Sequence, residues 1–329
     1  MEAVMKENKL WTILSIIFGL AAAAFIALTA MNILPKSGKE TEPPVQYELN
    51  ENVTLNKIGG ELGSLVSNNY KSAKFPAGIL DSMKQAYSVN PNLVGWLTIP
   101  GTEMDTTVLQ AADNDKYLKR DFYENWTGEL SGRLYGNIFL DYRCIGDGGL
   151  SKNMIIHGHT TGKSDGIPKQ SFRSLYDYRK KEHFIKNPII RYSTLTGVYT
   201  YKIYAVFYDS VNPKDDNGYF FNYIYPDMSD NNMKGYIEQV DQRALYKTGV
   251  GLEPTDKIIT LSTCIYDLGK SVETRLVVVG RLLRDGESTE IDSSLVKDNP
   301  DYRRPQVWYS RNGKTNPYKD SAKWEPSPN

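Results

Sequence analysis

The sequence predicts a mostly β domain, a barrel or sandwich of roughly 200 residues, behind an N-terminal membrane-spanning helix. Three observations lead to this prediction. Short runs rich in β-branched and aromatic residues recur through the middle of the chain, separated by turn residues. Tyr (23 residues) far outnumbers Phe (10) and Trp (5), and a large ring with a polar tip suits a half-buried strand face. Near the N-terminus, residues 11–34 carry no charge.

Composition excludes several classes of protein. The 329 residues contain 39 Lys+Arg and 39 Asp+Glu, so no basic excess indicates nucleic acid as a partner. A hydrophobic content of 40% is too high for a wholly disordered chain. With 2 Cys and 3 His, the chain is neither a disulfide-stapled scaffold nor a Cys₄ zinc module.

The uncharged run at 11–34 predicts a transmembrane anchor after a short cytoplasmic segment, residues 1–10. At 1.5 Å per helical residue it spans roughly 36 Å, enough to cross a hydrocarbon core with some tilt. A cleavable signal peptide has a shorter apolar core, about 7–15 residues, although small residues at 27–30 leave cleavage as the alternative. Two lysines precede the run and two follow it, so the positive-inside bias is weak.

We expect the large C-terminal portion to lie on the extracellular side of the cell membrane, the usual outcome for a short N-terminal anchor. Residues 35–76, which include Pro43 and Pro44, are expected to be a tether and a lead-in to the domain.

Hydrophobic spacing predicts a helix at 77–87, where Ile79, Met83 and Tyr87 share one face. Alternation at 199–203 predicts a strand with one buried and one wet face, whereas the continuous apolar run at 276–279 predicts a central strand buried on both. The predicted strands are residues 94–99, 136–140, 154–157, 189–195, 198–208, 257–263 and 275–283.

One further helix is predicted inside the β region. Ser229 is a good N-cap, and the apolar residues that follow recur at helical spacing as Met233, Tyr236, Ile237, Val240 and Ala244.

Beyond the last predicted strand, residues 285–329 form a polar tail rich in proline and charge. We expect it to be either poorly ordered or a strap across the domain; a contact with the cell wall or a partner is the alternative.

Cys264 ends a strongly β-prone run, where a rigid scaffold can present a reactive side chain. Two other interpretations stay open from the residues alone. Free cysteines are often inert and buried, and outside the cell Cys264 could form a disulfide with Cys144.

His157 and His159 form a His-Gly-His sequence after a predicted strand and would share one face of it. One of them could partner the thiol of Cys264; alternatively, both could join Cys264 in a zinc site, although spacing marks out no further ligand. His183 lies in a charged stretch and is expected to be solvated.

Arg275 follows Cys264 by eleven positions, a separation that suits a loop returning one strand to its neighbour. Arg275 could therefore lie beside Cys264. A surface arginine without such a role is the simpler alternative.

Together these residues resemble the sortase family, specifically class B. The resemblance rests on the Thr-Leu-Ser-Thr-Cys sequence at 260–264, on Arg275 after it and on the His-Gly-His sequence before it. It covers about residues 77–284, including the helix that begins after Ser229. Three further segments resemble class B in the same order, at residues 94–102, 117–123 and 136–143.

The resemblance implies an eight-stranded β-barrel with N-terminal helices and an inserted helix before the catalytic strand, within a domain of residues 77–284. It implies a membrane-anchored cysteine transpeptidase of Gram-positive bacteria, without a metal or cofactor, that anchors proteins at the cell surface. Its site would comprise Cys264 as nucleophile, His159 as acid and base, and Arg275 as stabiliser of the oxyanion. The family places a Gly directly before the catalytic His, which selects His159; at His157 this chain departs from the Tyr that is common there.

The implied partners are secreted proteins with a C-terminal signal like Asn-Pro-x-Thr-x and an acceptor amine, either of a peptidoglycan cross-bridge or of a pilin lysine. Ser262 and Thr263 flank the nucleophile and either line the substrate groove or are ordinary sheet residues. Two other functions stay possible: a surface cysteine peptidase that uses water as acceptor, and a non-catalytic membrane-tethered β module that binds a ligand.

Overall fold

The computed structural model describes residues 74–127, 136–160, 172–269 and 272–327. All of them belong to the second of two units, Met1–Asn50 and Glu51–Asn329, into which the chain divides. The predicted anchor and nearly all of the tether lie outside the described residues. Within those residues, we find no helix with the length and apolar character needed to span a membrane.

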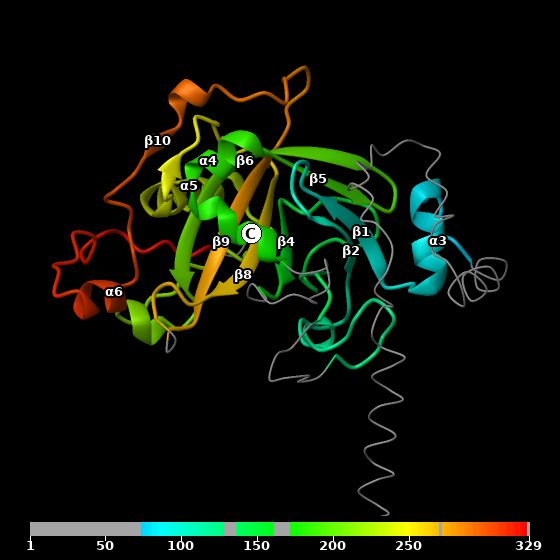
Figure 1. Cartoon of the computed structure of the whole chain (residues 1–329), viewed down its shortest axis with the longest axis horizontal. Helices are drawn as coiled ribbons and strands as arrows, with labels where there is room; N and C mark the ends of the chain where they lie inside the picture. The colour runs from blue at the N-terminus through cyan, green and yellow to red at the C-terminus, as the bar shows by residue number, and fades with distance from the viewer. Residues whose placement is uncertain (1–73, 128–135, 161–171, 270–271, 328–329) are drawn as a thin grey trace, which may run out of the picture. The chain divides into compact units, whose positions relative to one another are not determined.

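The fold is a closed barrel of eight strands in the order β1-β2-β3-β4-β8-β9-β6-β5 (Figure 1). Most neighbours are antiparallel, but β2 pairs with β3 and β4 pairs with β8 in parallel. The strands are β1 (Leu93–Thr98), β2 (Asp105–Leu109), β3 (Phe139–Leu140), β4 (Asn153–Gly158), β5 (Ile189–Thr194), β6 (Val198–Ser210), β8 (Ile258–Ile265) and β9 (Thr274–Leu282).

The mostly β prediction and the eight-stranded barrel are confirmed. The seven predicted strands all form, and their boundaries agree to within a few residues. The strand β2 (Asp105–Leu109) was not predicted, because five residues that begin with Asp-Thr-Thr give too short and too polar a pattern.

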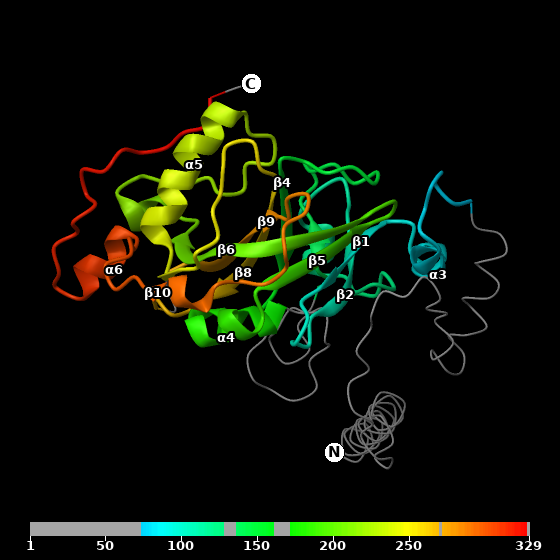
Figure 2. The same ribbon diagram turned by 90° about the horizontal axis from the view of Figure 1, so that it is seen from above.

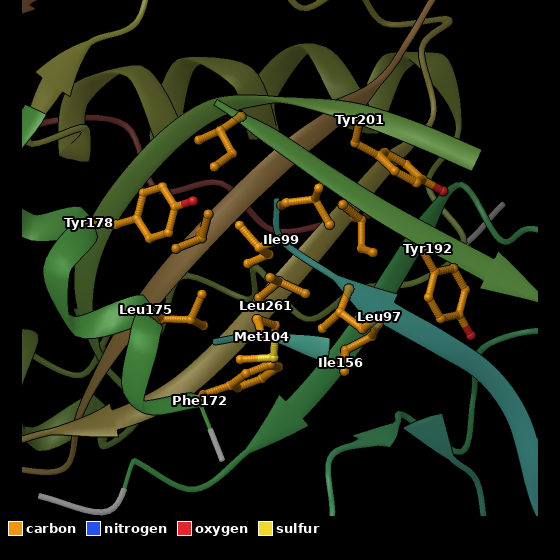
Figure 3. Packing of buried hydrophobic residues seen from close by; sticks show 14 of the residues in the cluster. Leu97, Ile99, Met104, Ile156, Phe172, Leu175, Tyr178, Tyr192, Tyr201 and Leu261 are labelled. Carbon is orange, nitrogen blue, oxygen red and sulfur yellow. The ribbon is translucent and has the colours of Figure 1, made fainter. Parts of the chain in front are cut away.

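The barrel interior is filled by side chains from every wall (Figure 3). The short helical segment η2 (Phe172–Arg179) closes one side and contributes three buried side chains. Gly158 permits this packing, since a Cβ there would lie 2.8 Å from the ring of Phe172. The labelled residues are Leu97, Ile99, Met104, Ile156, Phe172, Leu175, Tyr178, Tyr192, Tyr201 and Leu261.

A second apolar cluster covers the outer face of β6, β8 and β9. The helix α5 (Asp230–Arg243) packs there, and Ser229 caps it by accepting a hydrogen bond from the Asn232 amide. The central strand at 276–279 is therefore fully buried on both faces, as predicted. Residues of this outer cluster include Phe207, Phe221, Tyr223, Met233, Tyr236, Val240, Val277, Val279 and Trp324.

Three smaller α-helices lie among the described residues. The predicted N-terminal helix forms as α3 (Asp81–Val89), slightly later than expected, since Gly78 has φ +74°. α4 (Lys181–Lys186) and α6 (Gln306–Arg311) were not predicted. His183 lies on α4 and is partly exposed. One edge of its ring packs on Tyr178, with the two ring centroids 4.6 Å apart, so the residue is only partly solvated.

The tail is a strap, one of the two expectations for it. Its 3-10 turn η4 (Ser293–Leu295) leads into β10 (Lys297–Asp298), which pairs with β7 (Tyr246–Lys247), and the chain then runs along α5 (Figure 2). Residues 199–203 were expected to expose one face to water, but the strap covers part of that face. Lys202 is only 8% exposed, and its Nζ lies 3.0 Å from the Glu287 carboxylate of the strap.

Candidate active site

Three adjacent strands bring the predicted site residues together. Cys264 in β8 and Arg275 in β9 are direct partners in an antiparallel ladder. In the parallel ladder between β4 and β8, Gly158 is the partner of Thr263, so the next residue along each strand is His159 and Cys264. The topology thus places an imidazole, a thiol and a guanidinium in one row.

The side chains of Cys264 and Arg275 point to the outer face of the barrel. Alternate residues on a strand share a face, and Arg275 shares its face with Val277 and Val279 of the outer cluster. Cys264 shares its face with Ser262, whose hydroxyl lies 3.0 Å from the Tyr223 hydroxyl of the same cluster. The site therefore lies on the outer face, where the apolar cluster gives way to partly exposed residues.

The His159 ring is oriented by the connection between β2 and β3. Its Nε2 lies 2.9 Å from the carbonyl oxygen of Leu118. Burial lowers the pKa of His159, the hydrogen bond to Leu118 opposes that shift, and the positive charge of Arg275 lowers the pKa further. The ring is thus mainly neutral near pH 7, and Arg275 is close enough to act on it electrostatically.

Arg275 is half-buried and has hydrogen-bonding capacity to spare. Its Nη1 donates to the carbonyl oxygen of Thr274 at 3.3 Å. Within the part of the chain that the structure describes, no carboxylate forms an ion pair with Arg275, although many other arginines have one. A guanidinium that is not neutralised by a fixed acid can donate to a transient negative charge.

His157 occupies a different environment from His159. Its Nε2 lies 3.0 Å from Oδ2 of Asp141, a side chain fully removed from solvent that also accepts hydrogen bonds from Nε and Nη2 of Arg143 at 2.8 Å. Although burial opposes it, these contacts with Arg143 and His157 hold the pKa of the Asp141 carboxyl far below its usual range. Its ring also packs on Phe139, so His157 is a structural residue of the β3–β4 pair.

The zinc alternative gains no support from this geometry. His157 is paired with Asp141 and His159 with Leu118. Among the residues with described positions, no group of three or more His, Cys, Asp or Glu side chains could hold a metal ion.

Both cysteines are free thiols, so the disulfide alternative is not realised. Cys144 is buried and donates from Sγ to the carbonyl oxygen of Asn153. Burial raises the pKa of Cys144 to about 12, which keeps it protonated and unreactive. Cys264 is partly exposed.

Ser262 and Thr263, the two residues before Cys264, differ in position. Thr263 is buried, donates to the carbonyl oxygen of Gly158 at 2.7 Å and lies 2.5 Å from the Thr160 hydroxyl, so it joins the ends of β4 and β8. Ser262 faces the outer cluster beside Tyr223. Sequence reasoning missed Tyr223 and Leu118: a main-chain carbonyl leaves no side-chain pattern, and Tyr223 is one of 23 tyrosines.

Comparison with known proteins agrees with this arrangement. A family model described as Sortase domain matches residues 97–283. The chain is 31% identical over 240 residues to Sortase B of Listeria monocytogenes, a match that covers 73% of this chain and 89% of the relative. It is 29% identical over 197 residues to Sortase B of Staphylococcus aureus, covering 60% of this chain and 72% of that relative.

Solved structures give the same result. The S. aureus sortase B–substrate complex is 25% identical with a TM-score of 0.52, covering 68% of this chain and 92% of that one. A Bacillus anthracis sortase B in complex with AAEK1 is 27% identical with a TM-score of 0.51, covering 67% and 94%. The row of His159, Cys264 and Arg275 therefore lies in a fold and a sequence that both match, and the chain belongs to the sortase family, as a class B cysteine transpeptidase of the kind that sorts proteins to the cell wall.

Proposed function

We propose that Cys264 is the nucleophile of acyl transfer, that His159 is the general acid and base, and that Arg275 stabilises the oxyanion. The observation that supports this proposal is the direct pairing of Cys264 with Arg275, with His159 directly after the end of the adjacent strand β4. A nucleophile, a proton carrier and a charge stabiliser held by three neighbouring strands meet the geometric needs of acyl transfer.

In the first half-reaction, the Cys264 thiolate attacks a peptide carbonyl carbon and forms a carbon–sulfur bond. The carbonyl electron pair moves to oxygen, where the Arg275 guanidinium donates hydrogen bonds to the negative charge. The carbon–nitrogen bond then breaks, His159 protonates the leaving amine, and a thioester on Cys264 remains.

In the second half-reaction, an acceptor amine attacks the thioester carbonyl. His159 takes the proton of the amine, the carbon–sulfur bond breaks, and a new amide and the free thiolate result. Both halves use Arg275 in the same way, because both pass through an oxyanion at the same position.

The ordinary protonation equilibria of a thiol and an imidazole favour a slow reaction. With ordinary pKa values of 8.5 and 6.5, about 3% of a thiol is ionised and about a quarter of an imidazole is protonated at pH 7. The lowered pKa of His159 reduces the protonated share of its ring further. Tethering enzyme and acceptor at one surface raises the effective concentration and compensates for a slow step.

The substrate we propose is a C-terminal sorting signal of the Asn-Pro-x-Thr-x type on a secreted protein, with Ser262 beside the bound signal. The acceptor is an amine of the peptidoglycan cross-bridge or a pilin lysine. In this proposal residues 11–34 anchor the enzyme in the cell membrane with the catalytic domain outside, where both partners occur.

Mass spectrometry tests the proposal directly. The full chain in detergent is incubated with a library of Asn-Pro-x-Thr-x peptides. We expect an acyl adduct on Cys264 of the wild type and none on the variant Cys264→Ala. Added triglycine should convert the adduct into a transpeptidation product; release by water alone would identify a hydrolase. A folded protein that forms no adduct with any peptide would contradict the proposal.

A further inference from the structure

The C-terminal strap, residues 285–327, contacts two elements that border the proposed site. It begins just after residue 283, where the match to the family model ends, and the proposed chemistry uses none of its residues. Figure 2 shows it passing from the barrel edge through α6 to the outer side of α5. The contacts of the strap show which parts of the domain it holds in place.

The first contact is with the outer cluster. Trp324 is 8% exposed, and its indole lies so close to α5 that a Cβ on Gly235 would be 2.2 Å from Cδ1. Its Nε1 donates to the carbonyl oxygen of Asn232 at 2.9 Å, and its ring meets Phe221 edge-on at 5.7 Å. Trp324 therefore docks the strap on the cluster that contains Tyr223, the neighbour of Ser262.

The second contact is with the first part of the connection between β8 and β9, residues 266–269. Arg311, the last residue of α6, donates from Nη1 to the carbonyl oxygen of Leu268 at 2.8 Å. Gly269 has φ +112°, and a Cβ there would lie 2.2 Å from the same nitrogen. The guanidinium thus occupies the space that a side chain at Gly269 would fill.

This connection is also anchored from its other side. The Asp267 carboxylate accepts hydrogen bonds from Arg179 at 2.6 Å and from the hydroxyls of Tyr176 and Tyr208, each at 3.2 Å. Arg179 and Tyr176 belong to η2 and Tyr208 to β6. The main chain at 267–268 is therefore held between the barrel wall and Arg311 of the strap.

We expect the position of this connection to influence how Cys264 and Arg275 meet. The last ladder pair before it is Ile265 with Thr274, directly next to the pair of Cys264 with Arg275. A shift of the connection would displace the sulfur and the guanidinium relative to each other, and acyl transfer is sensitive to displacements of about 1 Å.

We propose that the strap is a positioning element of the active site and that Arg311 is its positioning residue. Arg311 fixes Leu268 and thereby the alignment of Cys264 with Arg275, while Trp324 keeps the strap docked. The catalytic consequence rests on the proposed function; the structural link between Arg311 and the β8–β9 hairpin does not.

The test compares the full-length wild type with Arg311→Ala, Arg311→Lys and the control Lys319→Ala. The control removes an exposed strap cation whose Nζ lies 3.8 Å from the carboxylate of its neighbour Asp320. For Arg311→Ala we expect kcat for acylation to fall about tenfold, with KM for the peptide within about twofold and an unchanged melting temperature. Arg311→Lys should recover most of the loss, because it keeps a donor. Lys319→Ala should match the wild type.

Hydrogen exchange provides a readout that needs no substrate. In Arg311→Ala the amides of residues 264–268 and 272–275 should exchange about tenfold faster, while those of β5 stay unchanged. The proposal is overturned if Arg311→Ala keeps both the kcat and the exchange rates of the wild type. It is also overturned if kcat falls only because a smaller fraction of the variant is folded. If Arg311→Ala does not fold, Arg311→Gln replaces it. A wild type that forms no acyl adduct contradicts the proposed function, and the exchange rates then decide the role of Arg311.

Discussion

Nε2 of His159 lies 2.9 Å from the main-chain carbonyl oxygen of Leu118. A carbonyl oxygen only accepts hydrogen bonds, so in the neutral ring Nε2 carries the hydrogen and Nδ1 is the nitrogen available for proton transfer. Leu118 ends η1 (Lys116–Leu118), and its neighbour Tyr117 is fixed by a 2.6 Å hydrogen bond to Glu124. The connection between β2 and β3 thus sets both the tautomer and the orientation of the proposed acid and base.

We expect an NMR titration of Cys264→Ala to give His159 a pKa below 6.5, because its ring is buried and lies near Arg275. Adding Arg275→Gln should raise that pKa by removing the positive charge. The neutral ring is the form that folding favours, so its contribution to stability is present above pH 6.5 and is lost as the pH falls toward the folded-state pKa. A pKa above 6.5, or one that Arg275→Gln leaves in place, would contradict this electrostatic account.

Arg275→Gln should lower kcat/KM for acylation by about 10²–10³-fold, the range seen when one oxyanion donor is removed. Arg275→Lys keeps the charge but loses the planar fork, and we expect it to stay at least about tenfold below the wild type. Single-turnover acylation followed by mass spectrometry measures both variants. Equal activity of Arg275→Lys and the wild type would show that charge alone suffices.

Trp324→Ala should destabilise the domain by about 3–5 kcal/mol, the cost of removing a large buried aromatic side chain. Its matched control is Trp126→Ala, because Trp126 is 63% exposed and its loss should change the free energy of unfolding by less than about 0.5 kcal/mol. Urea unfolding of both variants gives the comparison. Similar values for the two would mean that the strap is not docked through its indole.

Asp141→Asn should cost about 2–3 kcal/mol at pH 7, because it weakens charged hydrogen bonds to Arg143 and His157 at a fully buried carboxylate. The folded-state pKa of Asp141 lies far below the unfolded one, so the wild type loses this contribution as the pH falls below about 4. The difference between wild type and variant should therefore shrink in acid. Asp147→Asn, at an exposed residue, is the control and should show no such difference at either pH.

The sequence predicted those elements whose pattern is local. The β-branched runs gave the strands, and the spacing from Met233 to Ala244 gave α5, because burial of one helix face imposes a local period. The row of Cys264, His159 and Arg275 followed from a family resemblance, since pairing between distant strands leaves no local signal.

What the sequence did not predict depends on distant contacts. Lys202 was expected to be exposed to solvent, but Glu287 of the strap covers it. The polar strand β2 forms between β1 and β3, whose ladders satisfy its backbone. The hydrogen bond from His159 to Leu118 spans 41 positions and ends on a main-chain atom, which any residue type would supply.

The parallel pairing of β4 with β8 also has a kinetic consequence. The hydrogen bond from Thr263 to Gly158 closes a separation of 105 residues. The chain therefore loses conformational entropy when this loop closes, and that loss must be compensated for the pair to form. Contacts of such high sequence separation slow folding. Reactivity at Cys264 should consequently emerge late during refolding, after the local helices and hairpins have formed. A newly made chain would hold a catalytically inactive thiol until its barrel has closed.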